Sequence, residues 1–291
     1  MVLSSQLLES LKVALATAGD VRSFCELCYI MAFAYVNRRK TRFRRLVLCD
    51  LPALFLRAAD DKPVRVTLRI NGKKFDVLLP HGVATEFWSI RSIITEVLVH
   101  QVYRVDGALL PQIVVDAGAN FGLATLFYFS LWPQAHFVCF EPSSQTYAVL
   151  VRNLTANGID FVAIQKAVTN HTGVIRFDTN RSSMERAIVV GCDAHPDTEE
   201  VACTTLATEL RRLAIEQIDL LKFDVEGAEV DLLDGLGDHL SRISQIVGET
   251  HGEQLEQAVC QRLVSSGFTV TRQRGHILAQ VSHDSSHGFR G

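Results

Sequence analysis

The sequence predicts an α/β fold with a mostly parallel central sheet, and three features support that prediction. From about residue 110 onward, short apolar runs alternate with helical segments of about 10–15 residues, which is typical of βαβ units. A glycine-containing turn links the first of these strands to its helix. An acidic residue follows several strands, at the edge where α/β sheets bind ligands. Together these features indicate a Rossmann-like domain.

The order of elements follows from apolar periodicity and from turn residues. Ser143 or Ser144 caps a helix that ends at Asn157-Gly158. The polar segment 178–200 is either a functional loop over a ligand or a simple surface excursion. Two antiparallel strands around Arg274-Gly275 close the sheet. The expected strands are 113–115, 137–140, 161–168, 174–177, 220–223, 243–248, 268–271 and 277–281, and further helices are expected at 87–102 and 121–131.

A separate region precedes this sheet. Asn71-Gly72 lies between Val64–Ile70 and Lys73–Leu79, and such a pair between alternating apolar residues is a strong hairpin signal, because both turn positions need a positive φ. We expect residues 1–85 to form an N-terminal extension of helices and a β-hairpin. Residues 86–291 are then expected to form the α/β domain.

The composition narrows the functional classes. A net charge of −3 and a pI of about 6.4 do not resemble the basic domain of a nucleic-acid-binding protein. The seven cysteines are scattered and odd in number, which argues against a disulfide framework and favours a reducing, cytoplasmic location. No apolar run reaches the roughly 18–20 residues of a membrane span, and residues 1–12 do not resemble a signal peptide.

One basic segment departs from this picture. The apolar stretch 24–36 runs into residues 37–45, which hold six cations in nine positions. Residues 24–45 could therefore contact a membrane surface. We favour a packed helix followed by a solvated turn, because interfacial anchors usually have a longer amphipathic stretch.

The turn after the first strand is the most informative segment. Gly118 allows a sharp turn, and the small residues Ala119 and Gly122 let a ligand and the sheet approach the backbone. A dinucleotide-binding loop would carry a glycine in place of Asn120 and no preceding acid, which disfavours a nicotinamide dehydrogenase. Asp116 would repel a pyrophosphate, but it suits the ammonium of an amino-acid ligand such as S-adenosylmethionine.

Glu141 strengthens this interpretation. It follows the next strand, 25 residues after Asp116. A carboxylate there can accept both ribose hydroxyls, and it disfavours a 2′-phosphate. A solvated carboxylate is the alternative, but two acids at adjacent strand ends with a glycine turn between them rarely coincide by accident.

Three motifs, in order and spacing, resemble the FkbM-type methyltransferases: DAGANFG at 116–122, FEP at 140–142 and IDLLKFDVEGAE at 218–229. The resemblance covers roughly residues 87–270. It implies a class I methyltransferase fold, S-adenosylmethionine as cofactor, and usually O-methylation of a hydroxyl in a natural product, sugar or glycolipid. The cofactor-binding residues that it implies are Asp116, Gly118, Ala119, Asn120 and Gly122 around the methionine end, Glu141 at the ribose, Ala167 through its backbone at the adenine, and Asp224.

The candidates for chemistry follow the fourth and fifth strands. Asp224 and Glu226 follow the strand at 220–223, and Glu249 and His251 follow the next one. His251 is the preferred general base, because unperturbed imidazole titrates near neutrality; a lone histidine in a loop is as often an exposed surface residue. Alternatively, Glu226 caps the helix that begins near Ala228.

A metal site is considered and not predicted. Asp224, Glu249 and His251 offer the oxygen and imidazole ligands of a divalent cation, but no close Asp-Asp or His-x-His cluster is present. Cys25 and Cys28 lack a second ligand pair, so zinc is not expected there.

The sequence thus predicts an O-methyltransferase for a hydroxyl of a small-molecule, sugar or peptide acceptor, without a nucleic-acid partner. One alternative is a carboxyl O-methyltransferase, acting for example on a peptide C-terminus, because a carboxylate nucleophile needs no base. Another is a catalytically inactive cofactor-binding domain. The joint presence of Asp116, Glu141, Asp224 and Glu226 argues against the inactive domain.

Overall fold

The central sheet has seven strands in the order β11-β12-β10-β9-β3-β4-β5 in a computed structural model. The structure describes residues 12–20, 22–24, 64–80, 90, 92–105, 110–178, 198–273 and 275–281. Strands β5, β4, β3, β9 and β10 are parallel, and β12 pairs antiparallel with both β10 and β11. The predicted parallel sheet with a C-terminal antiparallel hairpin is confirmed. The strands are β3 (Ile113–Ala117), β4 (His136–Phe140), β5 (Phe161–Ile164), β9 (Ile218–Phe223), β10 (Ile243–Glu249), β11 (Phe268–Gln273) and β12 (His276–Val281).

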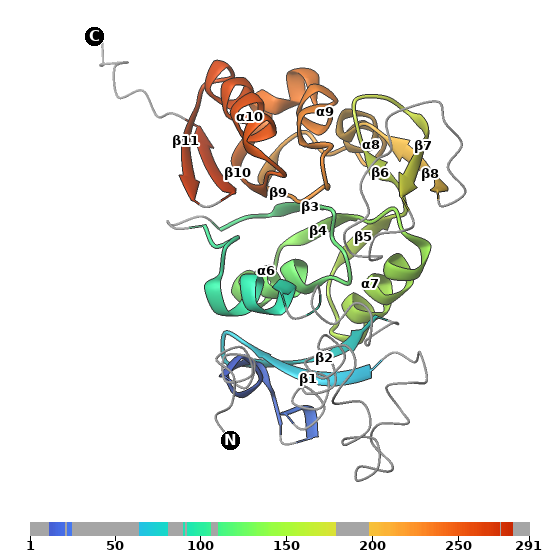
Figure 1. The fold of residues 1–291 in the computed structure, drawn as a ribbon, viewed down its shortest axis with the longest axis vertical. Coiled ribbons are helices and arrows are strands. Elements are labelled where there is room, and N and C mark those ends of the chain that lie inside the picture. Colours follow the sequence, from blue (N-terminus) through green and yellow to red (C-terminus); the bar gives the residue numbers. More distant parts are fainter. Residues whose placement is uncertain are drawn as a thin grey trace, which may run out of the picture.

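Two helical layers cover the sheet because side chains alternate between its faces. Val114 and Leu220 belong to one hydrophobic core, and the adjacent Val115 and Leu221 belong to another. Helices α6 and α7 lie on the first face, and α8, α9 and α10 lie on the second (Figure 1). The helices are α6 (Leu123–Leu131), α7 (Ser144–Ala156), α8 (Leu206–Arg212), α9 (Glu229–Asp234) and α10 (Glu253–Ser265), and a 3-10 helix, η2 (Gly237–Arg242), precedes β10.

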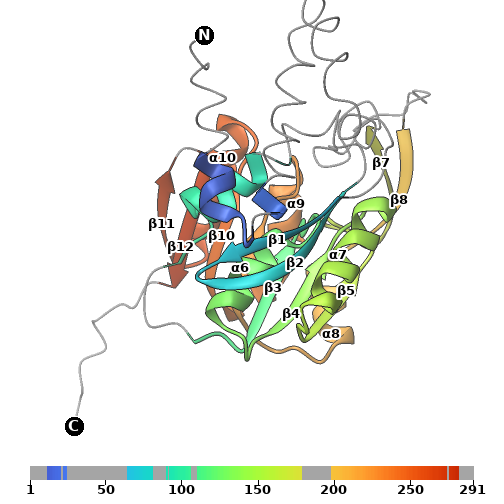
Figure 2. The ribbon, with the colours of Figure 1, turned by 90° about the horizontal axis from the view of Figure 1, so that it is seen from below.

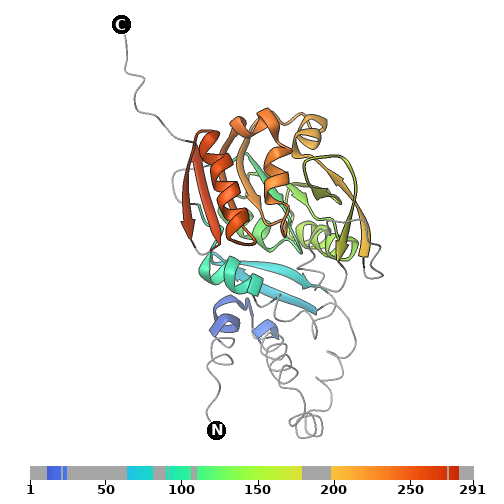
Figure 3. The ribbon, with the colours of Figure 1, turned by 45° about the horizontal axis from the view of Figure 1, so that its top comes forward.

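The predicted N-terminal hairpin is present as β1 (Val64–Ile70) and β2 (Lys73–Leu79). It lies against α6 and α7, and residues 12–20 and 22–24 lie beyond it, away from the central sheet (Figures 2 and 3). The Asn153 side chain accepts a hydrogen bond from Leu78 N at 2.7 Å and donates to Leu78 O at 3.0 Å. Asn157 pairs with Asp76 in the same way. Side chains of α7 thus bind the edge of β2 as a neighbouring strand would.

Two sequence-based boundaries are wrong. The strand expected at 161–168 is interrupted: β5 ends at Ile164, and β6 (Ala167–Val168) joins a separate three-stranded sheet with β7 (Gly173–Asp178) and β8 (Thr198–Thr204). The chain turns between β5 and β6, where Lys166 N donates to Ile164 O at 3.0 Å. Helix α6 begins after Gly122, whose φ of 92° is not helical.

Other predictions fall partly or wholly on residues that the structure does not describe. These are most of the basic segment 24–45, the centre of the polar segment 178–200 and Arg274. Within 87–102, residues 92–94 are α-helical and η1 (Thr95–His100) is a π-helix. Across the described residues, no helix combines the length and the apolar character needed to span a bilayer.

A buried ion pair joins the two central strands. Asp116 on β3 lies directly opposite Lys222 on β9, and Asp116 Oδ1 is 3.0 Å from Lys222 Nζ. Both side chains are almost completely excluded from solvent. Burial by itself would lower the pKa of Lys222, but the charge and hydrogen bond of Asp116, together with the charges of Asp224 and Glu249, raise that pKa above its usual value. Lys222 is therefore a charged group inside the sheet that depends on Asp116.

Replacing Asp116 with asparagine should destabilise the protein by about 3–5 kcal/mol, because it leaves a buried lysine charge without its partner. Urea unfolding measures the effect. The matched control is Asp234→Asn, since Asp234 pairs with Arg262 at 2.7 Å on the surface, where such a pair contributes at most about 1 kcal/mol. Equal losses in the two variants would contradict the role of the buried pair.

Candidate functional site

The loop after β3, residues 118–122, contacts the end of β9 through backbone atoms. We call it the cofactor loop, because the sequence predicts cofactor binding there. Gly118 has a φ of +76°, and a Cβ at this position would lie 1.8 Å from the carbonyl oxygen of Asp224. Asp224 N also donates to Ala117 O at 2.9 Å. Only glycine permits this approach, so the loop places Asp224 beside the cofactor-binding turn.

Glu141 is positioned by the same loop and is buried. Its Oε2 accepts a hydrogen bond from Asn120 N at 3.0 Å, and its Oε1 accepts one from Ser143 N at 2.9 Å. Burial raises the pKa of Glu141 to about 7, and these two hydrogen bonds limit the rise. A carboxylate offers about four lone pairs, so two remain for the ribose hydroxyls of a nucleoside ligand. The residue fits the role expected of it.

Asp116 lies elsewhere than the sequence suggested. We expected its carboxylate to face the ammonium of the ligand, but the side chain is fully buried. It accepts a hydrogen bond from Thr125 Oγ1 at 2.7 Å and pairs with Lys222. Lys222 Nζ in turn donates to Gly118 O at 2.7 Å. Lys222 thus links the Asp116 carboxylate to the loop. The pairing of β3 with β9 places this lysine opposite Asp116.

Of the other expected cofactor residues, two line a small cavity beside the loop and two lie elsewhere. Ala119 and Asn120 line a cavity of about 30 Å³ that also borders Tyr103 and Asp224. A Cβ on Gly122 would instead lie 3.0 Å from Leu150 of α7, so this glycine serves helix packing. Ala167 is buried in β6, where it pairs with Cys203 of β8.

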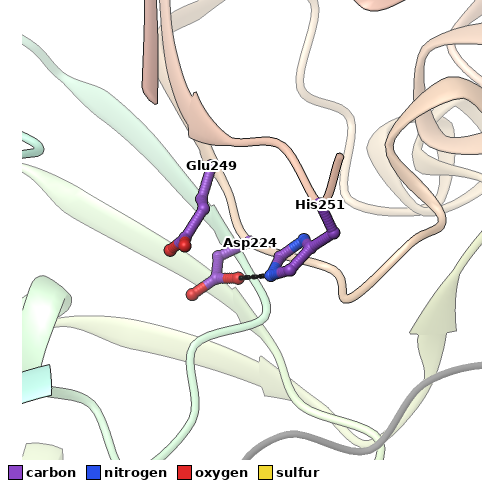
Figure 4. Close-up of side chains that lie close together, drawn as sticks. All are labelled: Asp224, Glu249 and His251. Carbon is purple, nitrogen blue, oxygen red and sulfur yellow. Dashed lines mark ion pairs between the residues drawn. The ribbon is translucent and has the colours of Figure 1, made fainter. Parts of the chain in front are cut away.

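The four candidate catalytic residues lie together at the carboxyl ends of β9 and β10. We call this group the acidic cluster: Asp224, Glu226, Glu249 and His251. The His251 Nε2 atom lies 3.8 Å from Asp224 Oδ1 (Figure 4). The same nitrogen lies 3.4 Å from Glu226 Oε2. Glu249 lies beside them, and one ligand atom each of Asp224, Glu249 and His251 lies within 4.8 Å of the others. These residues are close in space although they form no close cluster in the sequence.

His251 has an unusual electrostatic environment for a base. Its Nδ1 lies 2.6 Å from Oε1 of the completely buried Glu229. Burial would lower the pKa of His251, but the bond to Glu229 and the charges of Glu226 and Asp224 raise it to about 9. At neutral pH the ring is therefore protonated in this structure and does not accept a further proton.

The predicted capping role of Glu226 is wrong. Helix α9 begins at Glu229, and its N-cap residue Ala228 makes no side-chain hydrogen bond. Gly227 N donates to Glu229 Oε1 at 3.0 Å. Glu226 has a φ of 52°, and its carboxylate faces His251.

Three residues of the site were not predicted: Tyr103, Lys222 and Glu229. The Tyr103 hydroxyl lies 3.2 Å from Asp224 Oδ2 and 3.3 Å from Glu249 Oε2, and its ring lies 5.1 Å from Lys222 Nζ. Burial and the charge of Asp224 raise the pKa of Tyr103 well above its usual value, so the hydroxyl remains a donor. A lysine among the otherwise apolar residues of the expected strand 220–223 was the available signal for Lys222. Tyr103 belongs to no motif.

Comparison with known proteins indicates the family of this chain. The sequence model of a family described as "Methyltransferase FkbM domain" matches residues 116–290. "Methyltransferase sdnD" from Sordaria araneosa is 27% identical over 215 residues, which cover 62% of this chain and 83% of that protein. "AMB antimetabolite synthetase AmbE" from Pseudomonas aeruginosa is 31% identical over 202 residues, which cover 55% of this chain and 9% of that protein.

Among solved structures, the T. thermophilus 16S rRNA N2 G1207 methyltransferase RsmC, in complex with AdoMet and guanosine, aligns with a TM-score of 0.41. It is 15% identical and covers 76% of this chain and 51% of that one. The family match spans more than half of this chain and includes the cofactor loop, Glu141 and the acidic cluster. The chain therefore belongs to the FkbM methyltransferase family and is an S-adenosylmethionine-dependent methyltransferase with a class I fold.

Proposed function

We propose that the enzyme methylates a hydroxyl oxygen of a small-molecule acceptor, such as a natural product or a sugar. The observation that carries this proposal is the group of carboxylates at the ends of β9 and β10, beside the cofactor loop. These acids repel an anionic acceptor, whereas a hydroxyl brings a proton that a carboxylate can accept. The similarity to AmbE, which is named as an antimetabolite synthetase, supports a small-molecule acceptor.

On the cofactor side, the proposed roles follow from the contacts of each residue. Glu141 holds the ribose through its two remaining acceptor positions. Asp116 holds Lys222, and Lys222 fixes the carbonyl of Gly118, so this pair shapes the turn at the methionine end. The bound S-adenosylmethionine supplies a methyl group that its sulfonium makes electrophilic. The chain mainly aligns acceptor and methyl group, and such alignment contributes roughly 7–11 kcal/mol.

On the acceptor side, a carboxylate takes the hydroxyl proton. Glu226 and Glu249 are the proposed acceptors of that proton, because His251 is already protonated at neutral pH. Burial and the charge of Asp224 raise the pKa of Glu249, which strengthens it as a base. A positioned general base contributes about 10²–10⁴-fold to the rate.

The type of bond formed tests the acceptor class. We expect the labelled methyl group of S-adenosylmethionine to appear in an ether when the enzyme is supplied with paired alcohol and carboxylic acid acceptors. Mild alkali distinguishes the products, because it releases labelled methanol from a methyl ester and leaves a methyl ether intact. Labelled methanol as the main product would replace this proposal with carboxyl methylation.

The Glu226→Gln variant tests the carboxylate base. With a hydroxyl acceptor, kcat should fall by about 10²-fold or more, because a general base is lost. The Kd of S-adenosylmethionine should stay the same, since Glu226 lies outside the cofactor loop. Calorimetry and steady-state kinetics measure the two quantities. An unchanged kcat would remove Glu226 from the reaction, and the matching Glu249→Gln variant would then identify the base.

Cofactor affinity should depend on pH through Glu141. Its pKa of about 7 means that the carboxylate is mostly protonated at pH 6 and mostly ionised at pH 8. Ribose hydroxyls donate to the ionised form, so affinity should rise by up to about tenfold between these two pH values. Calorimetric titration of wild type and Glu141→Gln isolates the effect, because other titrating groups remain in the variant. Identical pH profiles for the two proteins would contradict this role.

A further inference from the structure

The cluster of Asp224, Glu249 and His251 has the dimensions of a cation site. The three residues come from the ends of two adjacent parallel strands and point toward one another (Figure 4). One ligand atom of each lies within 4.8 Å of the others. Two donors on opposite sides of a cation at about 2.1 Å are about 4.2 Å apart. Only small side-chain shifts are therefore needed to bring all three onto one ion.

The orientation of His251 is fixed from outside this cluster. Its Nδ1 lies 2.6 Å from Oε1 of Glu229, a side chain that is completely buried and aimed at the ring. The second oxygen of Glu229, Oε2, accepts no hydrogen bond from any described residue. A divalent cation at Nε2 would displace the proton that this nitrogen carries at neutral pH. The carboxylate on Nδ1 would keep the remaining proton there, as in carboxylate–histidine–metal arrangements. Nε2 here faces Asp224 and Glu226.

A second observation concerns Asp224. Its Oδ1 atom is buried and has no hydrogen-bond partner within the described part of the chain. This oxygen faces His251 Nε2 at 3.8 Å, which is too long for a hydrogen bond. The Tyr103 hydroxyl contacts the other oxygen, Oδ2, together with Glu249 Oε2. A buried acceptor without a donor is unfavourable, and a cation at this point would satisfy it.

We propose that Asp224, Glu249 and His251 bind a divalent cation of the Mg²⁺ and Mn²⁺ class. Two carboxylates and one imidazole, with no thiolate, form an oxygen-rich ligand set that suits these ions. Three protein ligands leave coordination positions for water or for the acceptor hydroxyl. The cation would lower the pKa of a hydroxyl bound there, and Glu226, outside the ligand set, would take its proton.

This inference deepens the proposed hydroxyl methylation, and it reverses the expectation of no metal. That expectation depended on spacing within the sequence. The parallel pairing of β9 and β10 brings the ligands together instead.

Titration with Mn²⁺ tests the site without cofactor or acceptor. The full chain is treated with a chelator and dialysed, and free Mn²⁺ is followed by its electron paramagnetic resonance signal. We expect one Mn²⁺ per chain. The His251→Gln variant should bind at least tenfold more weakly, although it removes no negative charge. If Mn²⁺ were held only by diffuse attraction to the acids, its affinity for this variant would be unchanged or higher. The direction of the change in Mn²⁺ affinity therefore distinguishes the two explanations.

Two further variants complete the design. Glu229→Gln should weaken Mn²⁺ binding by about 10–100-fold, the usual effect of losing a carboxylate that orients a histidine ligand. Asp160→Asn is the matched control, because Asp160 contacts His136 at 3.0 Å at the surface; it should leave binding unchanged. If His251→Gln does not fold, nitrogen coupling to Mn²⁺ in pulsed spectra of the wild type reports the imidazole ligand directly.

The outcomes distinguish a failure of the metal-site proposal from a failure of the proposed acceptor class. Absence of a stoichiometric Mn²⁺ site in the wild type, absence of nitrogen coupling, or full affinity in His251→Gln overturns the proposal. A wrong acceptor class would instead appear as an ester product, with Mn²⁺ binding intact.

Discussion

The site depends on one buried lysine. Lys222 lies at the centre of the sheet, where its charge is balanced by Asp116 on the neighbouring strand and its ammonium donates to the carbonyl of Gly118. The ring of Tyr103 lies next to it, and the same tyrosine contacts both Asp224 and Glu249. A single charged side chain thus connects the cofactor loop with the acidic cluster. Because a buried charge is tolerated only when it is paired, the strand register and the loop are constrained together.

The backbone contact at Gly118 has a comparable consequence. It places the start of the acidic cluster within van der Waals distance of the cofactor turn, without any linking side chain. The two sides of the site then differ in electrostatics. Burial favours the neutral form of Glu141, whereas neighbouring carboxylates favour the charged form of His251. In the proposed function, the ionised form of Glu141 accepts the ribose hydroxyls, and the carboxylates around His251 remove a proton or bind a cation.

The N-terminal hairpin packs against the same domain. Residues of β1 and β2 share a hydrophobic core with α6 and with β3, and the two asparagines of α7 satisfy backbone groups of β2. The hairpin therefore covers helices that would otherwise expose an apolar face. The division into residues 1–85 and 86–291 remains a prediction, and the shared core shows that the two regions pack as neighbours.

The sequence alone determined the elements that depend on local chemistry. The Asn71-Gly72 turn, the serine cap of α7, the alternation of strands and helices, and the motif at Asp116 and Glu141 are set by residues close in the chain, and the structure contains each of these elements. Only the tertiary structure decided what depends on distance: the lysine opposite Asp116, the tyrosine shared by two acids, the break after Ile164, and the grouping of Asp224, Glu249 and His251. These features arise from strand pairing and burial, which bring together residues that no sequence spacing relates.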